Sequence, residues 1–250
     1  MNRTDVTTTQ LDIRTGDGVA RAGLFVPDTL NVTRSAVLFY MDGIGYRPAL
    51  HAMAEQYAAA GYVVLLPDLF YRTGRYDPFD AKTAFRNDGS KAIIMANIHD
   101  TTQAMTRRDG HAFLATLNDA GATGPVGVVG YCMGGARALH AAAAFPERIR
   151  AAASFHGGGL ATDKFDSPHL VARDIKARLY VGCAGVDASF PPEQSAQLAE
   201  ALRRAEVDHT IENYVGMQHG WTVPDHLVFN ATGAARHWKR VLMLFEETLL

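Results

Sequence analysis

Short apolar runs alternate along the chain with segments in which apolar residues recur at helical spacing. Continuous apolar runs of strand length lie at residues 35–41, 62–67, 126–130 and 177–185. Helical spacing follows them at residues 47–62, 133–145, 191–205 and 227–250. Strands that are apolar throughout are buried on both faces, so the alternation predicts an α/β fold with a mostly parallel central sheet and helices on both faces.

The remaining segments complete this pattern. Residues 10–27 read as two short strands around the turn "TGDG", residues 150–158 and 208–214 as further strands, and residues 90–119 as one polar helical stretch. Residues 68–80 form a turn-rich loop. No repeat, linker or low-complexity tract divides the 250 residues, so a single domain spanning 1–250 is expected.

Charge and composition exclude several classes of partner. The chain has 24 basic and 26 acidic residues, which gives no electrostatic reason to expect nucleic acid or a membrane surface as a partner. The first residues contain no apolar segment typical of a secretory signal, so a cytoplasmic location with reduced thiols is expected. The two cysteines match no zinc spacing and the glycine-rich pieces match no phosphate loop, so neither a metal nor a cofactor is expected.

Polar residues follow nearly every apolar strand. Ligands in open parallel sheets bind at the carboxyl ends of the strands. The candidates at this edge are Asp42, Asp68, Cys132, His156, Asp187 and His219.

The segment "GYCMGG" has the form of a nucleophile elbow, a tight turn between a strand and a helix. Small residues at Gly130 and Gly134 allow the backbone to close this turn and to raise Cys132 above the sheet edge. The turn also directs the backbone N–H of Met133 toward the group that the nucleophile attacks. A helix N-terminus beneath the thiol favours the thiolate.

Two partners for the cysteine follow in the order that an elbow enzyme requires. Asp187 and His219 each follow their own strand, and the order nucleophile, acid, histidine is that of α/β-hydrolases. The alternatives are a buried structural thiol at Cys132, an ordinary turn aspartate at Asp187 and an ordinary loop histidine at His219. A disulfide to Cys183 is a further alternative, although Cys183 lies inside an apolar strand.

The segments "GYCMGG", "GVDASFPPEQ" and "MQHGW", preceded by "GYVVLLPDLFYR", resemble the dienelactone hydrolase family. The resemblance runs from about Ser35 to the C-terminus. It implies a single α/β-hydrolase domain that hydrolyses an enol-lactone without metal or cofactor. It also implies that Cys132 is the nucleophile, His219 the base and later the acid, and Asp187 the residue that orients the histidine.

The chain departs from the family pattern at three positions. The glutamate that usually follows the first central strand and lies near the thiol is replaced by Asp42, whose side chain is one methylene shorter. Of the two arginines that hold a substrate carboxylate, one is replaced by Val223, and Arg86 is offset by one from the other. The resemblance therefore supports the fold and the triad more strongly than dienelactone itself as substrate.

The prediction is a hydrolase that cleaves a small ester or lactone through an acyl-thioester. The backbone N–H groups of Met133 and Gly43 are the expected oxyanion donors. Side chains expected to modulate the thiol or bind substrate are Asp42, His156, Tyr71, Arg72, Arg86 and Trp221. The alternatives are a promiscuous carboxylesterase or thioesterase with no lactone role, and a non-catalytic thiol-sensing protein. The physiological substrate and the oligomeric state stay open.

Overall fold

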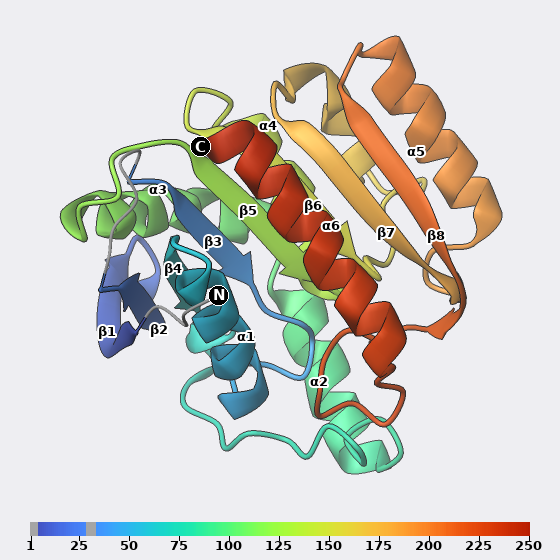
Figure 1. The fold of residues 1–250 in the computed structure, drawn as a ribbon. Helices are drawn as coiled ribbons and strands as arrows, with labels where there is room; N and C mark the ends of the chain where they lie inside the picture. Colours follow the sequence, from blue (N-terminus) through green and yellow to red (C-terminus); the bar gives the residue numbers. More distant parts are fainter. Residues whose placement is uncertain (1–4, 29–33) are drawn as a thin grey trace.

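A computed structural model describes residues 5–28 and 34–250 and shows them arranged around one mixed sheet (Figure 1). The eight strands lie in the order β1-β2-β4-β3-β5-β6-β7-β8. Strands β4 to β8 of this order run parallel, while β1 pairs antiparallel with β2, and β2 with β4. The strands are β1 (Val6–Thr15), β2 (Gly18–Pro27), β3 (Ala36–Tyr40), β4 (Val63–Pro67), β5 (Val126–Tyr131), β6 (Ile149–Phe155), β7 (Arg178–Val186) and β8 (His209–Gln218).

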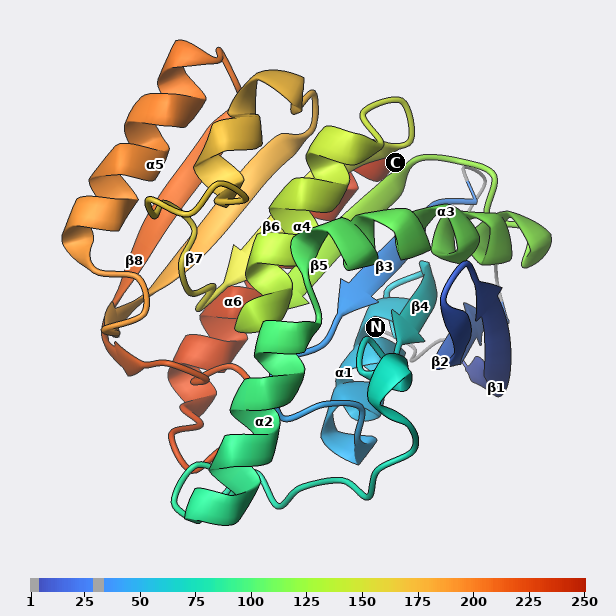
Figure 2. The same ribbon diagram turned by 180° about the vertical axis from the view of Figure 1, so that it is seen from behind.

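Helices cover both faces of the sheet, as the sequence predicts. Helices α1 and α6 lie on the face seen in Figure 1, and α3, α4 and α5 lie on the face seen in Figure 2. The helices are α1 (Pro48–Ala59), α2 (Asp88–Asp100), α3 (Gln103–Asp119), α4 (Met133–Ala144), α5 (Pro192–Arg204) and α6 (Ala231–Leu249), with short 3-10 turns at Tyr71–Thr73 and Pro168–Asp174. Among the described residues, no helix is long and apolar enough to cross a membrane.

Capping side chains explain two of the helix boundaries that differ from the sequence prediction. The single helix expected at 90–119 is two helices, because the Thr102 side chain accepts a hydrogen bond from the Met105 N–H and begins α3 anew. The terminal helix begins at Ala231 rather than near residue 227, because the Asn230 side chain caps it through the Gly233 N–H.

The strand order brings the chemistry-bearing residues to one edge. Asp42, Cys132, His156, Asp187 and His219 follow β3, β5, β6, β7 and β8, which are consecutive neighbours in the sheet. Because these strands are parallel, their carboxyl ends lie at the same edge. The fold therefore places five candidates in a row above the sheet.

Candidate active site

Cys132 occupies a strained turn between β5 and α4. Its φ of 54° lies in the left-handed region that side chains other than glycine rarely adopt. A Cβ at Gly130 would overlap the Gly134 carbonyl, and a Cβ at Gly134 would overlap the carbonyl groups of Tyr40, the last residue of β3, and of Met41, which follows it. The strand and helix can approach this closely only because both positions are glycine, as the elbow motif predicts.

His156 supports the turn through a hydrogen bond to the backbone of Cys132. It is buried, and its Nδ1 accepts a hydrogen bond from the Cys132 N–H at 3.1 Å. Because Nδ1 accepts, the ring proton of the neutral imidazole lies on Nε2, which donates to Thr222 Oγ1 at 2.8 Å. Burial holds the pKa of His156 well below its usual value, and the neighbouring His219 lowers it further, so the ring stays neutral.

An aspartate and a serine orient His219. Its Nδ1 lies 2.7 Å from Asp187 Oδ2 and 3.1 Å from Ser189 Oγ. Ser189 in turn donates to Asp187 Oδ1 through its hydroxyl, at 2.6 Å, and through its backbone N–H, at 2.8 Å. Burial raises the pKa of Asp187, but the hydrogen bond to His219 outweighs this effect, so the pKa is lowered and the carboxylate stays charged. The sequence analysis missed Ser189, whose place two residues after the aspartate is typical of a local aspartate turn.

The electrostatics of Cys132 and His219 favour an ion pair. Burial opposes ionisation of the thiol, but the charge of His219 and a hydrogen bond from it lower the pKa of Cys132 below its ordinary value. Burial also disfavours the charged imidazole, yet Cys132 and Asp187 together raise the pKa of His219 to about 11. Both shifts favour a thiolate beside an imidazolium, with Nδ1 bonded to Asp187 and Nε2 left for the sulfur.

One backbone N–H group contacts the sulfur, and a second lies at the start of the helix that follows it. Gly43 donates through its backbone to the Cys132 side chain, which favours the thiolate. A Cβ at Gly43 would overlap Ile98, so helix α2 packs directly on this loop. Met133 is the first residue of α4, where the N–H groups have no intrahelical acceptor. Both groups fit the role of oxyanion donor that the sequence assigns to them.

Asp42 lies in a buried charge network. Arg47 donates to both of its oxygens, at 2.7 and 2.8 Å, and also to Asp225, at 2.7 Å from Nε and 3.0 Å from Nη2. His226 Nε2 adds a contact of 3.2 Å to Asp42 Oδ2. Burial opposes ionisation of Asp42, but Arg47 and His226 hold its pKa far below the usual range. No sequence signal joined these four residues, because Asp225 lies 178 positions after Arg47.

Tyr71 and Arg72 belong to a different cluster. The Tyr71 hydroxyl lies 2.7 Å from Thr15 Oγ1 and donates to Asp109, and Arg72 forms ion pairs with Asp17 and Asp109. These contacts tie the 3-10 turn to the β1–β2 hairpin and to α3, and none of them reaches Cys132. We therefore do not carry Tyr71 and Arg72 into the proposed site.

Arg86, Trp221 and Val223 are the remaining positions that the sequence singles out, and they differ in exposure. Arg86 is exposed in the turn before α2. Trp221 is fully buried and packs edge-on against His156, with ring centroids 5.2 Å apart, so it supports the ring that contacts Cys132. Val223 is fully buried and places no charge at the position of the family arginine.

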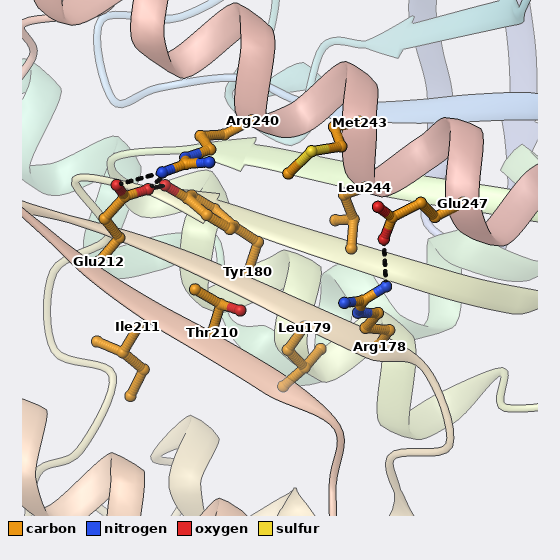
Figure 3. A pocket seen from close by; sticks show the side chains of 10 residues that line it. All are labelled: Arg178, Leu179, Tyr180, Thr210, Ile211, Glu212, Arg240, Met243, Leu244 and Glu247. Carbon is orange, nitrogen blue, oxygen red and sulfur yellow. Dashed lines mark hydrogen bonds and ion pairs between the residues drawn. The ribbon is translucent and has the colours of Figure 1, made fainter.

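A cavity of about 290 Å³ lies elsewhere, between α6 and the strands β7 and β8 (Figure 3). Its lining includes Arg178 and Thr210, which lie at the amino ends of these strands, opposite the triad edge. Its charged side chains pair with one another, Arg240 with Glu212 and Arg178 with Glu247. Among the described residues, no three or more His, Cys, Asp or Glu side chains are grouped to hold a metal ion.

The mixed sheet, the elbow and the helices on both faces define an α/β-hydrolase. Residues 21–249 match the model of the dienelactone hydrolase family, and the chain belongs to that family. It is a hydrolase of ester bonds, and the resemblance seen in the sequence is confirmed.

Named relatives and solved structures extend this comparison. The chain is 29% identical over 221 residues to a carboxymethylenebutenolidase from Rhodococcus opacus, covering 85% of this chain and 81% of that one. It resembles the structure of a dienelactone hydrolase-like promiscuous phosphotriesterase from metagenomic libraries, with a TM-score of 0.79, 23% identity, and coverage of 98% and 99% of the two chains. A cold-adapted esterase from an Arctic intertidal metagenomic library aligns with a TM-score of 0.70 at 15% identity, over 100% and 99% of the chains. These structural likenesses are evidence for the fold.

Proposed function

We propose that the protein hydrolyses a small, uncharged ester or lactone through a Cys132–His219–Asp187 triad and an acyl-thioester. The observation that carries the proposal is the chain of contacts from Asp187 through His219 to the cysteine of a strained elbow. A thiol sensor would need neither the aspartate nor the histidine. The relatives named carboxymethylenebutenolidase and dienelactone hydrolase make unsaturated lactones the first substrates to try.

In the acylation step, the Cys132 thiolate attacks the carbonyl carbon, and the negative charge moves to the carbonyl oxygen. The N–H groups of Met133 and Gly43 stabilise this oxyanion. The tetrahedral intermediate then expels the alkoxide, which takes the proton from His219 Nε2, and a thioester is left on Cys132. In a lactone the expelled hydroxyl stays tethered to the acyl group, so ring closure competes with hydrolysis.

In the deacylation step, neutral His219 takes a proton from water, and the resulting hydroxide attacks the thioester carbonyl. Collapse of the second intermediate releases the carboxylic acid and restores the thiolate–imidazolium pair. Asp187 and Ser189 keep the Nε2 side of the ring directed at the sulfur throughout. The buried neutral His156 holds the turn in place without competing for the proton.

The charges around the site favour a neutral substrate. Val223 supplies no cation, and Arg47 already pairs with two carboxylates. Because neither position offers a free cation to a substrate carboxylate, a simple carboxylesterase or thioesterase is the second candidate function. A small-molecule substrate and a cytoplasmic location are part of the proposal, the latter supported by two cysteines that form no disulfide.

A panel of esters, thioesters and unsaturated lactones, each with and without a carboxylate, tests the proposal on the wild type and three variants. We expect Cys132→Ala to abolish turnover and Asp187→Asn to lower kcat by about 10³-fold or more, since triad members act as a unit. Cys183→Ala is the matched control and should keep the wild-type rate. Turnover that survives in Cys132→Ala would refute the mechanism.

A further inference from the structure

The carboxylate of Asp42 has no room for another proton donor. Its Oδ1 accepts from Arg47 Nη1 at 2.7 Å and from the Ile44 N–H at 3.0 Å. Its Oδ2 accepts from Arg47 Nη2 at 2.8 Å and from His226 Nε2 at 3.2 Å. A carboxylate offers about four lone-pair positions, and four donors already occupy them. A proton from the Cys132 thiol could enter only if one of these contacts broke.

The same carboxylate shapes the loop that carries Gly43. The Ile44 N–H donates to the Asp42 side chain, and the Gly45 N–H donates to the Asp42 carbonyl at 3.2 Å. Arg47 also donates to the Gly45 carbonyl at 3.1 Å. The turn is thus wound around one buried ion pair, and Ile98 of α2 closes it from the other side.

Arg47 joins this loop to the loop that carries His219. Its guanidinium is buried and is shared between Asp42 and Asp225. Asp225 lies six residues beyond His219, and His226, which also contacts Asp42, is the next residue. One guanidinium therefore connects the oxyanion donor with the segment that follows the catalytic base.

We propose that Asp42, Arg47 and Asp225 form a charged clamp that positions the Gly43 N–H against the loop of His219, and that Asp42 is a positioning residue rather than the acceptor of the Cys132 proton. The clamp rests on the proposed function, because it acts on that oxyanion donor and that base. Arg47 also offsets the negative charge that Asp42 would otherwise place near the thiolate.

A double-variant cycle separates the clamp from a proton acceptor. Arg47→Gln leaves the Asp42 carboxylate buried without its main partner, so we expect kcat to fall by about 30-fold or more with KM within about threefold. Adding Asp42→Asn removes that charge and lets two amides face each other, and we expect kcat to recover by about tenfold. If Asp42 accepted the thiol proton, the double variant would be no faster than Arg47→Gln, and this result would overturn the proposal.

A milder variant avoids loss of the fold. Asp225→Asn changes a partly exposed side chain and leaves the Asp42–Arg47 pair in place. We expect kcat to fall by about three- to tenfold with an unchanged KM, because an oxyanion donor acts on the transition state rather than on ground-state binding. A kcat equal to that of the wild type would contradict the clamp.

Two controls separate this proposal from the proposed function. Arg240→Gln removes one of the guanidinium partners of Glu212 at the cavity of Figure 3, and should lower stability without changing kcat. Cys132→Ala is measured with the same substrates. Activity that persists in Cys132→Ala refutes the proposed function, whereas activity that depends on Cys132 but ignores Arg47 and Asp225 refutes the clamp alone.

Discussion

The backbone N–H of Cys132 donates to Nδ1 of His156 at 3.1 Å, and the opposite nitrogen of the same ring contacts Thr222 at 2.8 Å. Thr222 lies three residues after His219, so one buried imidazole connects the nucleophile turn with the loop of the base. Both His156 and Cys132 have positive φ, at 40° and 54°. The two strained residues hold each other through this bond, which explains how the chain keeps both in an unfavourable conformation.

Replacing His156 tests this support. His156→Ala removes the second acceptor of the Cys132 N–H and leaves only the Phe155 carbonyl. We expect kcat to fall by about tenfold or more and the melting temperature to drop, because a strained turn persists only when its surroundings fix it. Steady-state kinetics and thermal unfolding measure both effects. The exposed His111→Gln is the control, and unchanged kinetics in His156→Ala would show that the Phe155 carbonyl suffices.

The two cysteines should differ in their rate of alkylation, which mass spectrometry can measure. The pKa of Cys132 is lowered, despite its burial, by His219, whereas burial raises the pKa of Cys183 to about 11. Alkylation requires the thiolate, so iodoacetamide at neutral pH should label Cys132 and spare Cys183. Loss of hydrolysis should follow the extent of labelling at Cys132. Full activity in protein labelled completely at Cys132 would rule out the nucleophile.

The enzyme should not prefer a charged acid to its neutral ester. Val223 is apolar, and Arg47 is neutralised by Asp42 and Asp225. Comparison of kcat/KM for a carboxylated lactone and for its methyl ester should give values of similar size. A preference of about 100-fold for the acid would correspond to about 2.7 kcal/mol of carboxylate recognition and would contradict this view of the pocket.

Stability should fall with acid because of buried neutral histidines. Burial lowers the pKa of His237 to about 3, while an unfolded histidine has a pKa of about 6.5. Between these values the unfolded chain binds a proton that the folded chain excludes, so the free energy of unfolding falls as the pH falls, by about 1.4 kcal/mol per pH unit. The pKa of His156 is also lowered, which adds to the slope in the same direction.

Urea unfolding between pH 7 and 4.5 measures this slope. The free energy of unfolding of His237→Gln should change less with pH than that of the wild type, even where the variant is less stable. Below about pH 6.5 His219 adds no slope, because its pKa is raised to about 11 and its stabilisation is complete below its unfolded pKa. Above about pH 6.5 it adds a slope of the opposite sign, so the part of the curve below this value is the one to compare. Equal slopes in the two proteins would show that His237 is protonated in the folded state.

The three residues proposed as a triad can be picked out in the sequence because each follows a predicted strand. The elbow adds local constraints, glycines at fixed spacing, that a single sequence displays directly. The parallel sheet then brings the strand ends to one edge without further information. For this reason the sequence alone predicts that Cys132, Asp187 and His219 lie close together, as they do in the structure.

The supporting contacts were not readable, because they join positions far apart in the chain. The pair Arg47–Asp225 spans 178 positions, and the contact from His156 to Thr222 spans 66. Neither pair has a sequence pattern, since arginine, aspartate, histidine and threonine are common outside helices and strands. The contacts of Tyr71 and Arg72 were hidden for the same reason, because their partners on the β1–β2 hairpin lie far from them in the sequence.

The crossing of β5, α4 and β3 also limits how this protein can diversify. Backbone touches backbone at Gly130 and Gly134, so even an alanine at either position would push the nucleophile helix away from the sheet. A library aimed at new substrates gains nothing from varying these positions. Ile94 and Ile98 pack over the Gly43 loop from a helix that lies outside the sheet, so a substitution there would shift that loop rather than the elbow. The two glycines of the elbow therefore fix the position of Cys132, whereas the contacts from α2 offer a separate route to adjusting the site.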